Sequence, residues 1–256
     1  MITAGIDIGS RTIAMVVLEN AEIVRYALAE TGFTPVETVR GMVSSLPPGV
    51  TVTATGYGRH AARAGCARRA VTEIKAHALG VSRLCPEAGT VLDIGCQDMK
   101  VIVLGEKGSV EDFQMNDKCA AGTGKFLEVM AGALGYPSVE DFGRDALSGR
   151  TGTKISSMCT VFAESEAVSL LHREIDRRDI GRALHESVVA RALGLLQRVG
   201  HRAPLAFSGG VALNPCVVKL LEEKLQERVY VPQNPQLVGA LGAALAGEAE
   251  SDIPNP

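Results

Sequence analysis

The hydrophobic pattern near the N-terminus predicts two β-strands joined by a tight turn. Residues 2–8 are apolar around Asp7, residues 13–18 are apolar and partly β-branched, and Gly-Ser-Arg-Thr separates them at 9–12. A second hairpin of the same kind is predicted from strands at 90–95 and 99–104. Each first strand ends in D-I-G, and Asp93 follows Asp7 by 86 residues. This pair of hairpins is the clearest internal repeat in the chain.

The rest of the pattern predicts helices alternating with short strands, as in an α/β protein. A helix is expected after Cys119 and another after Cys159. Arg173–Arg182 is expected to be a solvated, charged helical surface. Further helices are expected over 34–46, 60–70, 73–79, 138–150, 185–199, 215–225 and 236–246, and short strands over 51–54, 204–208 and 229–231.

Two cysteines precede predicted helices in similar contexts. Cys119 lies in MNDKCAAGTGKFLEVMA (115–131), and Cys159 follows Ser156-Ser157-Met158. The N-terminus of a helix favours a thiolate, so we hypothesise that both cysteines are ligands of a metal or redox centre. The other four (Cys66, Cys85, Cys96 and Cys216) are expected to be small buried side chains, because no C-x-x-C pair or disulfide framework is apparent.

The two hairpin turns carry groups that suit a polyphosphate. The turn at 9–12 offers backbone N–H groups and hydroxyls to a phosphate, and Asp7 suits Mg²⁺, directly or through water. Gln97 and Asp98 are placed to orient a water near a γ-phosphate. One such turn is equally compatible with an ordinary hairpin. Two facing each other indicate a nucleotide held from both sides.

Two glycine-containing turns and one helix N-cap complete the predicted nucleotide site. The Gly-Thr-Gly turn at 122–124 opens a helix, where phosphate is commonly bound. Gly209 and Gly210 follow a strand and allow a nucleoside to approach the backbone. Asn214 is a suitable N-cap for a helix that begins at Pro215.

Composition narrows the classes of function. The chain has 256 residues, enough for two lobes. Its net charge of −3 and its 4% aromatic content give little support to nucleic-acid binding. Charged residues interrupt the apolar N-terminal region, and no run of about 18 apolar residues occurs, so neither a signal peptide nor a membrane span is expected. We expect a cytoplasmic protein.

The order of these motifs resembles the acetate kinase, sugar kinase, Hsp70 and actin superfamily. The resemblance implies a two-lobed fold with duplicated ribonuclease H-like lobes and a nucleotide in the cleft between them. The first lobe would comprise residues 1–90 with the C-terminal helix 236–247, and the second lobe residues 91–235. The cysteine motifs and G-G-V-A-L-N (209–214) are more closely similar to the activators of 2-hydroxyacyl-CoA dehydratases and the ATPase subunits of benzoyl-CoA reductase.

That family implies a homodimer with one 4Fe–4S cluster, held by Cys119 and Cys159 of both subunits. ATP hydrolysis would drive a low-potential electron into a partner iron–sulfur enzyme, with ferredoxin or flavodoxin as the donor. The partner could equally be a double-cubane cluster protein, because the sequence does not separate these branches. The chain departs from the family's usual D-I-G-G-Q-D-S-K at Cys96 and Met99.

The resemblance also assigns roles to residues. Asp7, Asp93 and Gln97 would be catalytic, Asp7 would organise Mg²⁺, and Thr123 and Gly124 would link the γ-phosphate to the cluster helix. The residues expected to bind ATP or ADP are Gly9, Ser10, Arg11, Thr12, Gly95, Gly122, Thr123, Gly124, Gly209, Gly210 and Asn214.

Two other functions stay open at this point. A small-molecule or carbohydrate kinase without a cluster would use the same hairpins, although no further aspartate-rich loop offers its catalytic base. A non-enzymatic nucleotide-binding regulator is disfavoured by the presence of Asp7, Asp93 and Gln97.

Overall fold

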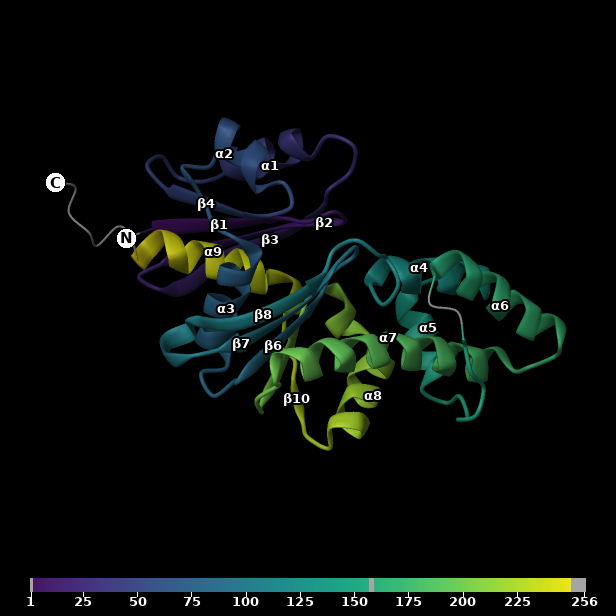
Figure 1. Ribbon diagram of the computed structural model, residues 1–256. Helices are drawn as coiled ribbons and strands as arrows, with labels where there is room; N and C mark the ends of the chain where they lie inside the picture. Colours follow the sequence, from purple (N-terminus) through teal and green to yellow (C-terminus); the bar gives the residue numbers. More distant parts are fainter. Residues whose placement is uncertain (1, 157–158, 250–256) are drawn as a thin grey trace.

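The computed structural model describes residues 2–156 and 159–249. Two five-stranded sheets dominate it, with strand orders β3-β2-β1-β4-β5 and β10-β9-β6-β7-β8 (Figure 1). The first consists of β1 (Ile2–Ile8), β2 (Thr12–Glu19), β3 (Glu22–Glu30), β4 (Thr51–Gly56) and β5 (Arg69–Ala70). The second consists of β6 (Thr90–Ile94), β7 (Met99–Leu104), β8 (Val110–Asn116), β9 (Leu205–Ser208) and β10 (Val229–Tyr230).

The predicted repeat is present as two equivalent hairpins. β1 pairs antiparallel with β2 and parallel with β4, and β6 pairs antiparallel with β7 and parallel with β9. In each sheet a third antiparallel strand, β3 or β8, extends the hairpin at the edge. This duplicated arrangement confirms the predicted two-lobed α/β fold class. The boundaries proposed for the lobes, at residues 90 and 235, stay predictions.

The edge strands β3 and β8 are absent from the sequence-based expectation. Nearly every residue of both strands is exposed or half-buried. A strand without a buried face lacks the alternation that marks a strand in sequence, so its pattern carries no clear signal. As a result, Met115 and Asn116 belong to β8 and not to the approach to a helix.

Helices surround the two sheets. They are α1 (Pro35–Ser44), α2 (Arg59–Gly65), α3 (Glu73–Leu84), α4 (Gly124–Ala133), α5 (Val139–Ala146), α6 (Thr160–His172), α7 (Arg177–Val199), α8 (Pro215–Leu225) and α9 (Val238–Ala249), with short 3₁₀ turns at Glu106–Gly108, Gly210–Leu213 and Pro235–Leu237. No helix within the described ranges is long and apolar enough to cross a membrane.

Several helix ends differ from the expected ones, and in two cases the difference changes which element the residues belong to. The helix expected over 60–70 ends at Gly65, and the chain then forms the short strand β5. The helix expected from 185 begins at Arg177, where the Asp176 carboxylate accepts the amide N–H of Arg178 as an N-cap. The end of the charged run therefore forms the first turns of this same helix.

The helices α3 and α9 lie between the two sheets (Figure 1). Helix α9 packs on β1, β2 and β4 on one side and on α3 on the other. A Cβ added at Gly242 would overlap the carbonyl of Ala76 in α3, and one added at Gly5 would overlap the carbonyl of Ala240. Small residues therefore set the close spacing of these layers.

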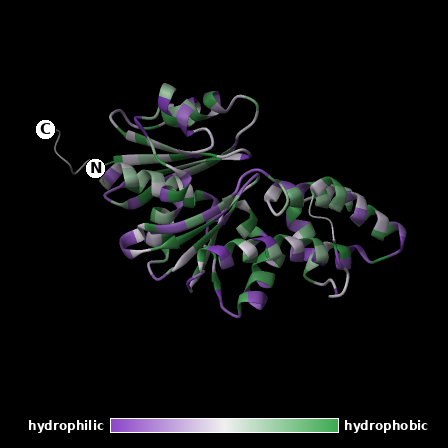
Figure 2. Cartoon of the chain, viewed as in Figure 1, coloured by the Kyte–Doolittle hydropathy of each residue, from purple (hydrophilic) through white to green (hydrophobic). Residues whose placement is uncertain are grey.

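The largest core lies in the second sheet and its helices. Phe126, Phe142 and Phe207 are fully buried there, with apolar residues of α4, α5, α7 and α8 around them. Hydrophobic residues dominate the inner strands of both sheets, whereas hydrophilic residues lie at the edges, in loops and along the outer faces of helices (Figure 2). This core fixes the second hairpin and the helices next to the two motif cysteines.

Candidate functional site

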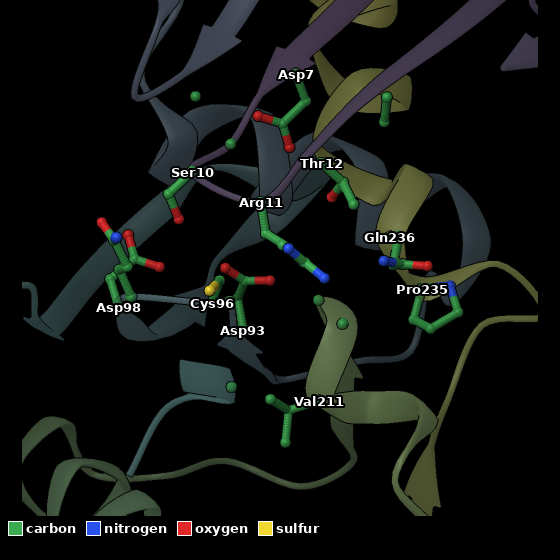
Figure 3. Close-up of a pocket in the computed structure, with 18 of the residues that line it drawn as sticks. Asp7, Ser10, Arg11, Thr12, Asp93, Cys96, Asp98, Val211, Pro235 and Gln236 are labelled. Carbon is green, nitrogen blue, oxygen red and sulfur yellow. The ribbon is translucent and has the colours of Figure 1, made fainter. Parts of the chain in front are cut away.

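A cavity of about 610 Å³ opens between the two hairpins. All of the residues predicted to bind or process nucleotide line it, except Gly122 and Thr123. Figure 3 shows Asp7, Ser10, Arg11 and Thr12 on one wall, with Asp93, Cys96 and Asp98 on the facing hairpin. The lining residues from these predictions are Asp7, Gly9, Ser10, Arg11, Thr12, Asp93, Gly95, Gln97, Gly124, Gly209, Gly210 and Asn214.

The two turns close in the same way. The amide of Gly9 donates to the carbonyl of Thr12 at 3.0 Å, and the amide of Gly95 donates to the carbonyl of Asp98 at 3.0 Å. Equivalent hydrogen bonds give equivalent turns, with residues 10–11 and 96–97 at their tips. The walls therefore present two similar sets of backbone groups to one cavity.

Gly209 adopts the left-handed region of backbone conformation, with φ of 86°. A Cβ at this position would overlap the carbonyl of Ile94. The Gly-Gly turn predicted for a nucleoside thus packs directly on the strand that carries Asp93. Glycine is required here both by backbone conformation and by space.

Asp93 is buried at the centre of a polar network. The hydroxyl of Ser208 donates to Asp93 Oδ1 at 3.1 Å, and His77 Nδ1 lies 3.5 Å from the same oxygen. Lys100 Nζ lies 3.3 Å from Asp93 Oδ2. Burial by itself would raise the pKa of Asp93, but His77 and Lys100 outweigh it and lower that pKa. Asp93 is therefore held as a carboxylate.

Lys100 joins three acidic side chains. Its Nζ lies 2.7 Å from Glu73 Oε2, at the start of α3, and 2.7 Å from Asp98 Oδ2. Burial would favour the neutral amine, yet the surrounding carboxylates raise the pKa of Lys100. Burial also raises the pKa of Asp98. Lys100 thus fixes the second hairpin to α3 as a buried cation.

Asp7 occupies the equivalent position on the first hairpin. Burial raises its pKa to about 6, while the nearby His77 acts in the opposite direction. A Cβ at Gly56 or Gly239 would overlap the Asp7 carboxyl, so only glycine leaves room for it. Two carboxyl groups facing one cavity fit Mg²⁺, which usually takes one or two protein carboxylates together with phosphate oxygens.

The sequence prediction did not include several residues of this site. Glu73 and His77 come from α3, and Gln236 precedes α9; all three line the cavity together with Lys100. Lys100 ends the D-I-G-C-Q-D-M-K motif and could have been found there. The α3 residues gave no signal, because their helix reaches the cavity only through tertiary packing.

Helix α4 begins on the second hairpin. The amide of Gly124 donates to the carbonyl of Gly95 at 2.9 Å, and the amide of Lys125 donates to the carbonyl of Cys96 at 2.8 Å. The first two N–H groups of α4 are therefore bonded to protein and are not open to a phosphate. Thr123 is buried and its hydroxyl donates to the carbonyl of Ala120. The nucleotide contacts expected for Gly122 and Thr123 stay predictions.

Asn214 has two structural partners. Its Oδ1 accepts the amides of Cys216 and Val217, which confirms the predicted N-cap of α8. Its Nδ2 lies 3.0 Å from His185 Nε2. The side chain also lines the cavity, so the contact with adenosine remains a prediction alongside this structural role.

Cys119 and Cys159 are the exposed cysteines. Cys159 is the N-cap residue of α6, as expected, and α6 packs against α4. Cys119 lies four residues before Thr123, the N-cap of α4, so it is not itself the N-cap of this helix, and its role as a ligand stays a prediction. Ser157 and Met158 of the second cysteine motif lie outside the described residues.

The remaining cysteines correct one expectation. Cys85 and Cys216 are buried and Cys66 is partly buried against a hydrophobic core, as expected of structural cysteines. Cys96 instead lines the cavity, and burial raises its pKa. The residue that departs from the family motif is thus part of the site wall.

The thiols can be tested against a four-thiolate cluster. In the described part of the chain, no group of three or more His, Cys, Asp or Glu is arranged to hold a metal. Two exposed cysteines, which precede a pair of packed helices, would supply half of a Cys₄ ligand set, and a second copy of the chain would supply the other half. The thiol donors and their exposure are compatible with a cluster shared between two subunits.

The fold and cavity define a two-lobed nucleotide-binding protein of the actin and Hsp70 type. Residues 4–247 match the model of the BadF/BadG/BcrA/BcrD ATPase family, and the chain belongs to this family. It is 43% identical over 254 residues to the activator of lactoyl-CoA dehydratase of Anaerotignum propionicum, covering 96% of each chain.

Two crystal structures are similar over nearly the whole chain. One is component A of (R)-2-hydroxyglutaryl-CoA dehydratase from Acidaminococcus fermentans, with a TM-score of 0.90, 38% identity, and 98% and 100% of the two chains covered. The other is the activator of 2-hydroxyisocaproyl-CoA dehydratase from Clostridium difficile with bound ADPNP. Its TM-score is 0.89, at 38% identity, with 100% and 99% covered.

Proposed function

We propose that this ATPase is a homodimeric activator that uses MgATP hydrolysis to deliver a low-potential electron to a partner iron–sulfur enzyme. The relatives described as dehydratase activators support a role of this class. The observation that carries the proposal is the connection through α4. This helix is hydrogen-bonded to the second hairpin at its start and packs against α6, which begins directly after Cys159.

The two hairpins would process the nucleotide together. Asp7 and Asp93 would hold Mg²⁺ from opposite walls, and the turn at 9–12 with Gly95 would bind phosphate oxygens through backbone N–H groups. Gln97 is exposed at the tip of the second hairpin, where its amide would orient the attacking water. Gly209, Gly210 and Asn214 would contact adenosine.

The cysteines would hold the redox centre. Cys119 and Cys159 of each subunit would ligate one 4Fe–4S cluster, which when bound supplies one-electron transfer at low potential. The exposure of both thiols supports ligation at a surface that a second subunit covers. Because α4 touches both the hairpin and α6, a nucleotide-dependent shift of the hairpin would reach the cysteine region.

The relatives support two partner classes for the electron, a 2-hydroxyacyl-CoA dehydratase or a benzoyl-CoA reductase-like enzyme. The sequence resemblance adds a double-cubane cluster protein as a third acceptor, and ferredoxin or flavodoxin as the donor. One of the benzoyl-CoA reductase subunits of Thauera aromatica is 36% identical over 177 residues, which cover 67% of this chain and 62% of that relative.

Metal analysis tests the proposal. Strictly anaerobic protein is purified as wild type, as Cys119→Ser and as the control Cys66→Ser, and iron, acid-labile sulfide and MgATP turnover are measured. We expect about four irons and four sulfides per dimer in wild type and control, and loss of both in Cys119→Ser with the fold retained. Wild type that hydrolyses MgATP but cannot be loaded with iron would instead favour the small-molecule kinase.

A further inference from the structure

An ion pair joins the first hairpin to helix α4 across the cavity. Arg11 Nε, at the tip of the first hairpin, lies 3.5 Å from Glu128 Oε1 in α4. Both residues line the cavity, and Figure 3 shows the Arg11 side chain extending into it. The second hairpin already binds the start of α4 through Gly95 and Cys96. Helix α4 is therefore contacted by both phosphate hairpins.

The exposure of this pair argues against a role in stability. The Arg11 side chain is 60% exposed and that of Glu128 is 29% exposed. Ion pairs in such surroundings contribute little to folding, because water screens them and the long side chains lose conformational entropy. Lys125, in α4 itself, already neutralises Glu128 with Nζ 3.2 Å from Oε2. The contact with Arg11 therefore needs another explanation.

The geometry allows Arg11 to bind two anions at once. A guanidinium is a planar fork with five N–H donors, and carboxylate and phosphate groups match its edges. The Nε edge faces Glu128, whereas the far end of the side chain extends into the cavity (Figure 3). Asp7, expected to bind Mg²⁺, belongs to the same hairpin, so a metal-bound terminal phosphate would lie within reach of the same wall.

We propose that Glu128 positions Arg11 to bind the γ-phosphate of ATP, so that α4 distinguishes ATP from ADP. This role rests on the proposed ATPase site and adds a positioning residue to it. With ATP, Arg11 bridges phosphate and Glu128 and fixes α4 against the first hairpin. With ADP, Arg11 has no third phosphate to bind, and the bridge is limited to the exposed ion pair.

Nucleotide affinity tests this role without depending on turnover. Magnesium-dependent binding of ADP and of a non-hydrolysable ATP analogue is measured by calorimetry on the full anaerobic protein. The variants are Glu128→Gln, Arg11→Gln and the double variant. Glu140→Gln is the matched control, since Glu140 also lines the cavity but pairs with Arg144 within α5.

We expect Glu128→Gln to weaken binding of the ATP analogue about fivefold or more while changing ADP affinity less than about twofold, a difference of the size that one hydrogen bond supplies. In the Arg11→Gln background, Glu128→Gln should have no further effect. Glu140→Gln should not weaken binding of the ATP analogue, because it removes the same charge without changing the contact with Arg11. Amide exchange in 124–133 should slow with the ATP analogue in wild type and not in Glu128→Gln.

Other results overturn the proposal. Tighter binding of the ATP analogue in Glu128→Gln would mean that Glu128 competes with phosphate for Arg11, and unchanged binding would mean that Glu128 does not position Arg11. An equal loss of affinity for the ATP analogue and for ADP would assign Glu128 a general role in the pocket. Wild type that binds neither nucleotide would instead contradict the proposed function itself, so the two failures are distinguishable.

Discussion

The amide of Gly124 donates a 2.9 Å hydrogen bond to the carbonyl of Gly95, which fixes the first residue of α4 to the tip of the second hairpin. A Cβ at Gly124 would crowd that carbonyl and the backbone of Cys96. The contact joins the second hairpin, which forms one wall of the cavity, to helix α4, which packs against α6. The second hairpin and the start of α4 are therefore joined through backbone atoms, the path by which a change at the hairpin would reach this helix.

Gln97 should affect hydrolysis more than binding. It is exposed and lines the cavity at the tip of the second hairpin, as a water-orienting amide requires. We expect Gln97→Ala to lower kcat about 10²-fold, in the range of a lost proton-transfer or water-positioning group, with ATP affinity nearly unchanged. Single-turnover hydrolysis and calorimetric Kd measure the two effects. An equal loss of turnover and of ATP affinity would assign Gln97 to binding. The control is Gln114→Ala, which removes an exposed amide on β8.

Lys100 should be essential for stability. Its removal in Lys100→Met leaves Glu73, Asp93 and Asp98 together without their shared cation. Breaking a buried ion pair on one side typically costs about 3–5 kcal/mol. We expect a loss of that order in the free energy of unfolding, measured by urea denaturation.

Two variants calibrate the Lys100 result. Glu73→Gln should cost clearly less, because Lys100 keeps two carboxylates. Lys219→Met removes an exposed lysine that pairs with Glu223 in the same helix, and should change stability by less than about 0.5 kcal/mol. If Lys100→Met were as stable as wild type, the network would not hold the hairpin to α3.

The buried His185 should contribute less to stability in acid. Burial lowers its pKa to about 4 from the ordinary 6.5, with the bond to the Gly181 carbonyl acting the other way. Nδ1–H donates to that carbonyl, so Nε2 accepts from Asn214 and has no room for a proton. Below pH 6.5 the unfolded chain binds a proton at this histidine that the folded chain does not, so the contribution of His185 to stability falls as the pH drops from 6.5 towards 4. Asp7, whose pKa is raised to about 6, acts in the opposite direction below pH 6, so the effect of His185 is read from the difference between wild type and variant.

The size of this effect follows from linkage. The pKa of His185 differs by about two to three units between the unfolded and the folded chain. This difference lowers the contribution of His185 to the free energy of unfolding by about 3 kcal/mol at pH 4 and by roughly 2 kcal/mol at pH 5. Urea unfolding at pH 7 and pH 5 should show a smaller decrease in His185→Gln than in wild type. His172→Gln, at an exposed histidine, should retain the full decrease. Identical pH profiles for wild type and His185→Gln would show that His185 is not the responsible group.

Gly242 should not tolerate a methyl group. In Gly242→Ala the Cβ would meet the carbonyl of Ala76, forcing α9 away from α3. Overpacking of this kind costs about 1–3 kcal/mol. Gly194→Ala is the matched change in helix α7, where a Cβ meets no atom within 4 Å, and it should stabilise by up to about 1 kcal/mol. Thermal unfolding compares the two, and equal Tm values would contradict the close packing of α9.

Much of this fold is determined by local sequence. The hairpins at Asp7 and Asp93 are visible because buried strands and tight turns impose a repeated pattern of apolar runs and glycine. The start of α8 is equally local, since the Asn214 side chain and Pro215 act within one turn of chain. The predicted residues that line the cavity could be found for the same reason, because each lies in or next to a turn or a helix start.

Tertiary structure alone decided the rest. The strands β3 and β8 have no buried face and depend on pairing with their neighbours. Glu73 and His77 reach Asp93 and its network only because α3 packs between the sheets, and Arg11 meets Glu128 only because the two hairpins face one cavity. Helix α4 begins at Gly124 rather than directly after Cys119, and its first two amides bond the carbonyls of Gly95 and Cys96. Local pattern specifies elements, whereas contacts between distant side chains depend on how those elements pack.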